Sequence, residues 1–150
     1  MSLRGSLARG RSAGATVLVV EDEPSMRFLC RVNLEMTGYE VLEAASGQEA
    51  LEQVQAPGLD LVLLDVMLPD IGGHEIARRL HEAPTPAFAF VSARASREDL
   101  RAGYELGAVD YITKPFDPIE LANRVREILG RIDRGESETF RLARLAELAE

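Results

Sequence analysis

Residues 59–70, which read LDLVLLDVMLPD, decide the fold of this chain. The apolar run at 61–64 is typical of a strand that is covered on both faces of a parallel sheet. The run ends at Asp65, and the chain then turns toward Pro69. A carboxylate in this place lies at the edge of the sheet where ligands bind in open α/β folds. Asp65 is therefore the first candidate for a functional residue.

Strand-like and helix-like segments alternate along the rest of the chain. Ser46 and Ser96 each precede an acidic residue by three positions, which is the capping-box pattern of a helix start. Pro118 fits the first helical position after an N-cap at Asp117. The alternation predicts an α/β fold with a parallel sheet, right-handed crossovers and helices on both faces. The predicted strands are about 16–21, 39–45, 60–65, 87–92 and 109–114, and the predicted helices are 24–37, 47–56, 74–82, 97–106 and 118–132.

Polar residues follow several of the predicted strands, and the carboxyl ends of parallel strands share one edge of a sheet. Neighbouring carboxylates there repel one another unless a cation lies between them, and Mg²⁺ suits carboxylates combined with phosphate. Asp65 is then a nucleophile able to form an acyl phosphate. Lys114 and Ser92 can bind phosphoryl oxygens. The peptide bond between Lys114 and the following proline is a candidate for the cis form. The residues at this edge are Glu21, Asp22, Asp65, Ser92 and Lys114.

The composition limits the class of protein. With 150 residues and 46% hydrophobic content, the chain is long and apolar enough for one folded domain. A net charge of −8 argues against nonspecific nucleic-acid binding, and no apolar run approaches the ~20 residues that span a bilayer. The single cysteine, Cys30, excludes an intramolecular disulfide and fits a reducing cytosol. We therefore expect a cytoplasmic protein without direct contact to nucleic acid or membrane.

The two ends of the chain differ from its body. Residues 1–15 are rich in Gly, Ser, Ala and Arg and lack periodicity, so we predict a disordered tail. Residues 16–132 form the folded domain. Residues 133–150 begin with a polar break and continue as an Ala/Leu/Glu/Arg-rich stretch, in which Ser137 is a candidate cap for a sixth helix. We interpret this segment as a helical tail or as the start of a linker to an output domain.

Four motifs stand at the predicted strand ends. They are VLVVEDEP at the first strand, LVLLDVMLPDIGG around Asp65, FVSAR at the fourth strand and ELGAVDYITKPF around Lys114. Each alone is weak, but together and in this order the chain closely resembles the receiver domain of bacterial response regulators. The resemblance covers about residues 15–132. It implies a flavodoxin-like fold, in which a five-stranded parallel sheet of order 2-1-3-4-5 has its site between strands one and three.

The resemblance implies a phosphoacceptor site with a metal ion. Asp65 looks like the phosphoacceptor, which takes a phosphoryl group from the phosphohistidine of a sensor histidine kinase or of a phosphotransfer protein. Asp22 and Asp65 resemble direct ligands of Mg²⁺, and Glu21 resembles a neighbour that acts through water. The backbone carbonyl of Met67 would be the third protein ligand.

The resemblance also implies a switch. Ser92 and Lys114 would bind phosphoryl oxygens, and Tyr111 matches an aromatic residue that turns inward when Ser92 moves toward the phosphate. This change would alter the surface formed by the fourth helix, the fifth strand and the fifth helix. The expected partners of that surface are an output domain or partner protein and, in a phosphorylation-dependent homodimer, a second copy of the chain.

The chain departs from the family pattern at a few positions. Glu21 stands where Asp is commoner, and Ser92 stands where Thr is commoner. Met67 and Arg94 occupy positions that tune the lifetime of the phosphate in the family. Because an apolar Met67 gives no help in positioning an attacking water, we predict slow autodephosphorylation. We therefore expect a phosphorylated signalling protein rather than an enzyme that turns over a substrate.

Three other interpretations share some of these features. A haloacid-dehalogenase-type phosphatase needs a second Asp at the position of Met67, which argues against that class. A flavodoxin needs a phosphate-binding loop after the first strand, where the acidic residues 21–23 would repel phosphate. The third alternative concerns context, because the chain could be the receiver module of a hybrid histidine kinase or of a cyclic-dinucleotide signalling enzyme.

Overall fold

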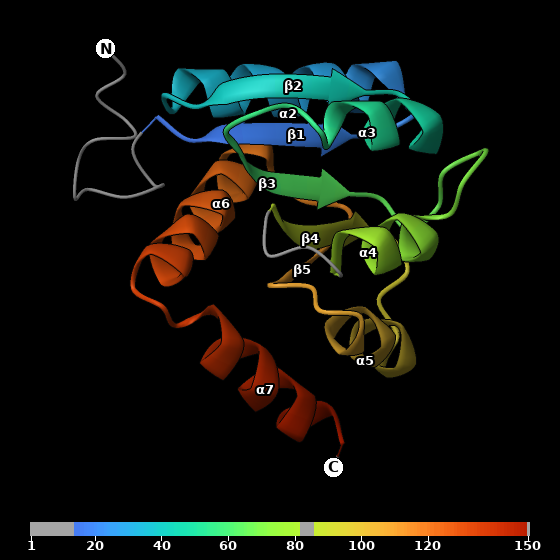
Figure 1. Ribbon diagram of the computed structural model, residues 1–150, viewed down its shortest axis with the longest axis vertical. Helices are drawn as coiled ribbons and strands as arrows, with labels where there is room; N and C mark the ends of the chain where they lie inside the picture. Colours follow the sequence, from blue (N-terminus) through green and yellow to red (C-terminus); the bar gives the residue numbers. More distant parts are fainter. Residues whose placement is uncertain (1–13, 82–85, 150) are drawn as a thin grey trace.

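The computed structural model describes residues 14–81 and 86–149. Its sheet has five parallel strands in the order β2-β1-β3-β4-β5 (Figure 1). The predicted fold class and strand order are therefore confirmed. The predicted disordered tail lies almost entirely outside the described residues, as does the predicted last residue of the third helix. The strands are β1 (Thr16–Val20), β2 (Glu40–Ala44), β3 (Leu59–Leu64), β4 (Ala87–Ser92) and β5 (Tyr111–Thr113).

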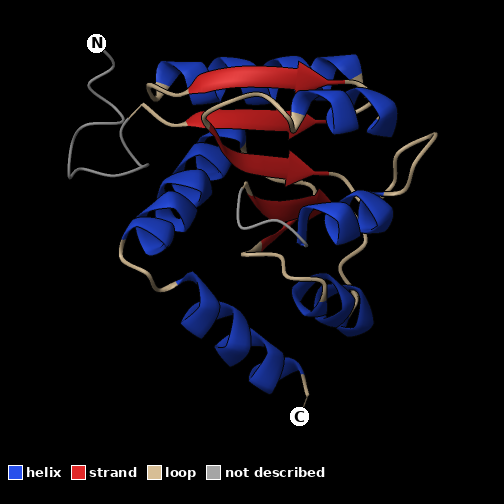
Figure 2. Cartoon of the chain, viewed as in Figure 1, coloured by secondary structure: helices blue, strands red, loops and turns tan. Residues whose placement is uncertain are grey.

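Helices cover both faces of the sheet (Figure 2). One face carries α2 (Pro24–Met36) and α6 (Pro118–Asp133). The other carries α3 (Gly47–Gln53), α4 (Gly73–His81) and α5 (Arg97–Glu105). The chain continues beyond α6 into α7 (Ser137–Leu148), which packs mainly against α5.

Alternate side chains of the central strands supply the two halves of the core. In β1, Val17 and Val19 belong to the apolar cluster shared with α2 and α6, whereas Leu18 and Val20 belong to the cluster on the opposite face. Because successive side chains of a strand point to opposite faces, a strand covered on both faces must be apolar at every position. Each fully buried side chain of this kind contributes about 1.5–3 kcal/mol to folding. This explains the continuous apolar runs from which the sheet was predicted.

The predicted helix starts are confirmed, with one change in detail. At α5, Ser96 and Asp99 form the full capping box, and at α6 the carboxylate of Asp117 accepts from the Ile119 amide at 2.8 Å. At α3, Ser46 accepts from the Glu49 amide at 3.2 Å, but the Glu49 carboxylate accepts from the amide one residue before Ser46.

A second acidic residue completes the N-terminus of α3. The Asp70 carboxylate, in the loop after β3, accepts from the amides of Gly47 and Gln48 at 2.8 and 2.9 Å. These hydrogen bonds hold the pKa of Asp70 below its usual range. The loop that follows Asp65 is thereby tied to a neighbouring helix.

The prediction that Ser137 caps the last helix is wrong. Ser137 is the first residue of α7, and its buried hydroxyl has no hydrogen-bond partner among the described residues. The N-cap is Glu136, whose amide donates to the carbonyl of Arg131 at 2.8 Å. Because Gly135 adopts a positive φ of 71°, the chain turns tightly between α6 and α7 and the helix begins before Ser137 can cap it.

Candidate functional site

The site begins where hydrogen bonding between strands ends. The amide of Glu21 still donates to the carbonyl of Ala44 in β2, and the amide of Asp65 donates to Val20 in β1. The amide of Lys114 likewise donates to Ser92 in β4, at 2.9 Å. Glu21, Asp65 and Lys114 therefore each lie one position past a strand, with a backbone fixed by hydrogen bonds to the neighbouring strand.

Three carboxylates meet at this edge. Glu21 and Asp22 follow β1, and Asp65 follows the adjacent strand β3. One oxygen from each lies within 4.8 Å of the others. Glu21 and Asp65 are only 5% and 6% exposed, whereas Asp22 is exposed to solvent. These three residues come together as their positions after the strands predicted.

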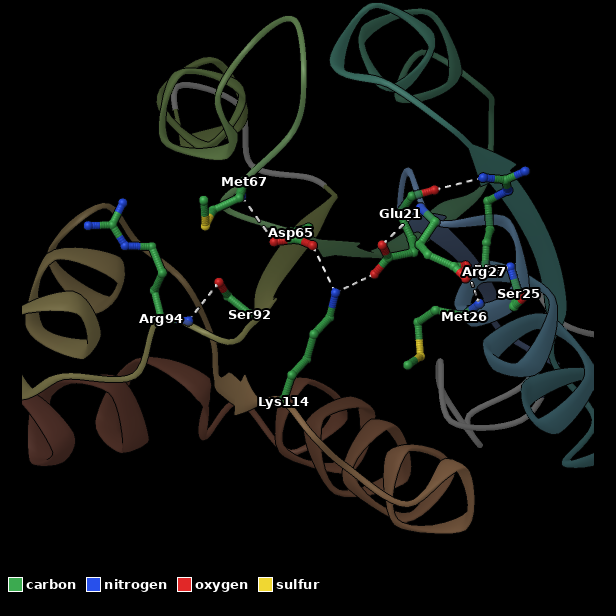
Figure 3. A network of polar contacts seen from close by, with 10 residues as sticks. Glu21, Ser25, Met26, Arg27, Asp65, Met67, Ser92, Arg94 and Lys114 are labelled. Carbon is green, nitrogen blue, oxygen red and sulfur yellow. Dashed lines mark hydrogen bonds and ion pairs between the residues drawn. The ribbon is translucent and has the colours of Figure 1, made fainter.

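Lys114 bridges the two buried carboxylates (Figure 3). Its Nζ donates to Asp65 Oδ2 at 2.8 Å and to Glu21 Oε1 at 2.5 Å. Burial lowers the pKa of Lys114, but the hydrogen bonds to Asp65 and Glu21 outweigh burial and raise this pKa above its ordinary value. The peptide bond to Pro115 is cis, as predicted. Lys114 is also the only lysine among the 17 lysine and arginine residues of the chain. The sequence alone therefore distinguishes it from every other side chain of permanent positive charge.

Backbone amides occupy the remaining oxygens of the buried carboxylates. Asp65 Oδ1 accepts from the Met67 amide at 3.0 Å, and Glu21 Oε2 accepts from the Glu23 amide at 3.1 Å (Figure 3). The side chain of Met67 is 59% exposed beside the site. Arg27 of α2 donates to the backbone carbonyl of Glu21 at 2.8 Å. Arg27 was not predicted from the sequence, because nothing in its sequence context distinguishes it from the other arginines.

Ser92 and Tyr111 form a second group on adjacent strands. The Ser92 hydroxyl is fully buried and accepts from the Arg94 amide at 3.2 Å (Figure 3). The Tyr111 hydroxyl donates to the backbone carbonyl of the same Arg94. The Tyr111 ring is buried against Phe90 at a centroid distance of 5.7 Å, and burial raises the pKa of its hydroxyl. One residue, Arg94, thus connects the predicted hydroxyl to the predicted switch residue.

Asp110 forms a buried network that the sequence analysis did not predict. Its carboxylate is 2% exposed and accepts from the side chains of Arg124 and Arg131, both at 2.8 Å. It also accepts from the hydroxyl of Tyr104 at 3.1 Å and from the amide of Tyr111 at 2.8 Å. No short motif could reveal this network, because the side-chain partners lie 6 to 21 residues away in the sequence.

The donor set of the site fits a hard divalent cation. Three carboxylates face one ammonium group, so two negative charges are left without a partner. Within the described parts of the chain, Asp22 makes no hydrogen bond or ion pair, and its oxygens are open to solvent. Mg²⁺ prefers one or two carboxylates together with water and phosphate oxygens. The geometry therefore suits a metal-assisted reaction at Asp65.

Comparison with known proteins places this arrangement in a family. Residues 17–126 match the family model described as "Response regulator receiver domain". The chain is 42% identical to the phosphate regulon transcriptional regulatory protein PhoB of Pseudomonas aeruginosa over 128 residues, which cover 83% of this chain and 56% of that protein. It is also 42% identical to the alkaline phosphatase synthesis transcriptional regulatory protein PhoP of Bacillus subtilis over 116 residues, covering 77% of this chain and 48% of that protein. The chain thus spans about half the length of these curated relatives.

Solved structures agree with this assignment. A CheY-like response regulator receiver domain protein from Methanospirillum hungatei matches with a TM-score of 0.75 and 30% identity, over 81% of this chain and 98% of that one. The response regulator DrrB of Thermotoga maritima, an OmpR/PhoB homologue, matches with a TM-score of 0.71 and 34% identity, over 79% of this chain and 54% of that one. Fold, motifs and relatives lead to one conclusion: the chain belongs to the response regulator receiver domain family of two-component systems.

Proposed function

We propose that Asp65 is the phosphoacceptor of this receiver domain and that its donor is the phosphohistidine of a sensor histidine kinase or of a phosphotransfer protein. One observation carries the proposal. The Asp65 carboxylate lies at the end of β3 with the Lys114 ammonium group 2.8 Å away and with the oxygens of Glu21 and Asp22 within 4.8 Å. A nucleophilic oxygen, a positive charge and a potential metal site therefore occupy one place.

In the proposed reaction, an oxygen of Asp65 attacks the phosphorus atom, and the bond from phosphorus to the histidine nitrogen breaks as the new P–O bond forms. Lys114, which donates a hydrogen bond to Asp65 Oδ2 in the unphosphorylated chain, would donate to one of the phosphoryl oxygens. Asp22, Asp65 and the backbone carbonyl of Met67 would bind Mg²⁺, with Glu21 acting through water. The ion, when bound, neutralises charge on the phosphoryl oxygens.

Ser92 and Tyr111 would carry the signal onward. The Ser92 hydroxyl, which accepts from the Arg94 amide and lies beside the Tyr111 hydroxyl, would donate its proton to a phosphoryl oxygen. A shift of Ser92 would move Arg94, whose carbonyl also holds the Tyr111 hydroxyl. The phosphoryl group would thereby change the populations of two conformations of the surface formed by α5, β5 and α6.

The relatives favour an output that controls transcription, because several of them are named as transcriptional regulators. They do not favour the context of a hybrid kinase or a cyclic-dinucleotide enzyme. No described helix is long and apolar enough to cross a membrane. We propose a cytoplasmic protein whose partners are a kinase, an output domain and, in the phosphorylated state, a second copy of the chain. Apart from assisting its own phosphorylation, the chain would catalyse only slow dephosphorylation, since the exposed thioether of Met67 cannot position an attacking water.

Substitution of Asp65 tests the proposal directly. In Asp65→Asn, incubation with Mg²⁺ and acetyl phosphate should give no phosphoryl adduct in the intact mass spectrum, whereas the wild-type chain should gain one. Asp60→Asn is a matched control, because Asp60 lies in the same strand and holds the Thr16 amide at 2.9 Å, a hydrogen bond that asparagine can keep. Labelling of Asp65→Asn at the wild-type rate would refute the proposal.

A further inference from the structure

The last helix, α7, is docked on the receiver but is held more loosely than the other helices. Among residues 137–148 none is buried, whereas α6 buries five of its residues. Phe140, Leu145 and Leu148 are partly buried against the apolar cluster that includes residues of α5, whereas Leu142 is 52% exposed. In Figure 1, α7 lies beside α5 and away from the sheet. A helix with so little buried apolar surface can leave without unfolding the core.

Two arginines join α5 and α7 in a reciprocal way. Arg97, the first residue of α5, donates to the carbonyls of Glu147 and Leu148 at the end of α7, at 2.8 and 3.1 Å. Arg141, near the start of α7, donates to the carbonyl of Tyr104 at the end of α5, at 2.7 Å. The last carbonyls of a helix lack partners within the helix, and a positive charge there is favourable. Each helix therefore contributes an arginine to the C-terminal end of the other, although the Tyr104 carbonyl also accepts from the Gly107 amide at 3.0 Å.

The capped end of α5 is also the part of α5 that covers Tyr111. Gly103 precedes the capped Tyr104, and a Cβ atom placed on Gly103 would meet the Tyr111 ring at 2.9 Å. Tyr104 lies below the Arg144 guanidinium group of α7, which is 5.8 Å from the ring centroid. Its hydroxyl donates to Asp110, next to Tyr111. Movement of α7 therefore acts on the residues that enclose Tyr111.

We propose that α7 can detach from the receiver as an intramolecular clasp, that is, a helix that holds another element in place when it is docked. Docked α7 keeps α5 packed over Tyr111. Docking of α7 and burial of Tyr111 are therefore coupled. The outer surface of α5 therefore binds an amphipathic helix that carries arginines, and this helix is α7 of the same chain. This deepens the proposed function and rests on it for the link to Asp65. If phosphorylation favours the buried position of Tyr111, it also shifts the docking equilibrium of α7 toward the docked state. By linkage, docked α7 then favours the phosphorylated state by the same free energy.

The first test needs no phosphoryl group. In the 150-residue chain carrying Arg141→Ala, hydrogen exchange of residues 137–148 should accelerate about tenfold through loss of a charge-assisted hydrogen bond. The fluorine NMR signal of 3-fluorotyrosine at position 111 should shift toward that of an exposed ring. Arg101→Ala is the control, because Arg101 is exposed on α5 and pairs with Glu105 of its own helix. Unchanged exchange, an unchanged Tyr111 signal, or exchange that slows with protein concentration would overturn an intramolecular clasp.

The second test measures the sign of the coupling. With Mg²⁺ and beryllofluoride, a phosphoryl analogue, exchange of α7 should slow in the wild-type chain, and Arg141→Ala should bind beryllofluoride several-fold more weakly than Arg101→Ala does. Faster exchange of α7, or equal binding by the two variants, would overturn the coupling. A wild-type chain that fails to bind beryllofluoride at all would instead refute the proposed function, and the first test would still decide whether α7 clamps Tyr111.

Discussion

Lys114 acts as a counter-ion for two carboxylates that the fold buries. Glu21 and Asp65 lie nearly out of solvent, and without a metal ion the ammonium group of Lys114 is the positive charge that contacts both of them. Two buried carboxylates with no cation would be costly, since burial penalises the charged form and like charges repel. The same lysine that is proposed to bind the phosphoryl group therefore stabilises the site before phosphorylation.

Lys114→Ala should consequently destabilise the metal-free chain. We expect a loss of about 2 kcal/mol, below the ~3–5 kcal/mol of a fully buried pair, because water reaches the lysine. Mg²⁺ should still bind, and should restore more stability to this variant than it adds to the wild-type chain. Urea unfolding with and without Mg²⁺ measures both quantities. Equal Mg²⁺ effects in the two proteins would show that Lys114 does not neutralise the carboxylates, and a normal phosphorylation response would count against its proposed role.

His74 gives the chain a second residue-scale property, a dependence of stability on pH. Burial, assisted by Arg78 and Arg94, lowers the pKa of His74 below its ordinary value of 6.5, while Asp99 acts in the opposite direction. The folded chain therefore binds this proton less readily than the unfolded chain. The stability linked to His74 is complete above pH 6.5 and declines as the pH falls through 6.5 toward the lowered pKa.

Substitution of His74 by Gln should flatten this part of the pH profile. The difference in free energy of unfolding between pH 7 and pH 5 should be smaller in His74→Gln than in the wild-type chain. His81→Gln serves as the control, since His81 is the other histidine of the chain and is exposed at the end of the same helix. Identical profiles for His74→Gln and the wild-type chain would contradict the linkage.

At the scale of elements, the position of α5 depends on the absence of a side chain at Gly103. A Cβ atom on Gly103 would approach the rings of Tyr111 and Phe90 to 2.9 and 3.0 Å, so alanine should force α5 or the rings apart. Although alanine favours a helix over glycine by ~1 kcal/mol, overpacking of a core costs about 1–3 kcal/mol. We therefore expect Gly103→Ala to lower the stability and to displace Tyr111.

Gly130 provides the matched control on α6. A Cβ atom there would meet mainly the flexible end of Arg134, at 3.1 Å, so the higher helix propensity of alanine should prevail. Gly130→Ala should be neutral or stabilising by up to ~1 kcal/mol in thermal unfolding, whereas Gly103→Ala should be destabilising. If both variants behaved alike, close packing at Gly103 would not control the position of α5.

The strands and the candidate site could be predicted from the sequence, whereas the location of α7 could not. Apolar runs predicted the strands because burial on both faces leaves no freedom of composition, and the candidate site residues were predicted because each lies at or just past the end of such a run. The location of α7 was beyond the sequence. Its apolar residues include the exposed Leu142 as well as the docked Leu145 and Leu148, so their pattern does not define the docked face. The caps of α7 by Arg97 and the enclosure of Asp110 depend on partners brought together only by the tertiary fold.

At the scale of the whole molecule, the proposed metal site would couple the stability of the fold to the concentration of a metal ion. The chain carries a net charge of −8, and its carboxylate cluster lies at the carboxyl ends of two adjacent strands, β1 and β3. A ligand that binds the folded chain but not the unfolded chain stabilises it in proportion to the logarithm of its concentration. If the site binds Mg²⁺, about 100-fold excess over its Kd adds roughly 2.7 kcal/mol to the free energy of unfolding.

Asp22 is the position at which this coupling can be removed most cleanly. Because Asp22 is exposed and has no partner within the described ranges, Asp22→Asn should leave the metal-free stability unchanged or slightly raised through reduced repulsion. It should nevertheless abolish most of the increase in melting temperature that Mg²⁺ gives the wild-type chain. Asp117→Asn, which keeps a side chain able to cap α6, should respond to Mg²⁺ as the wild-type chain does. A full Mg²⁺ response in Asp22→Asn would mean that the ion stabilises the molecule at some other place, and the carboxylate cluster would lose its proposed role as the metal site.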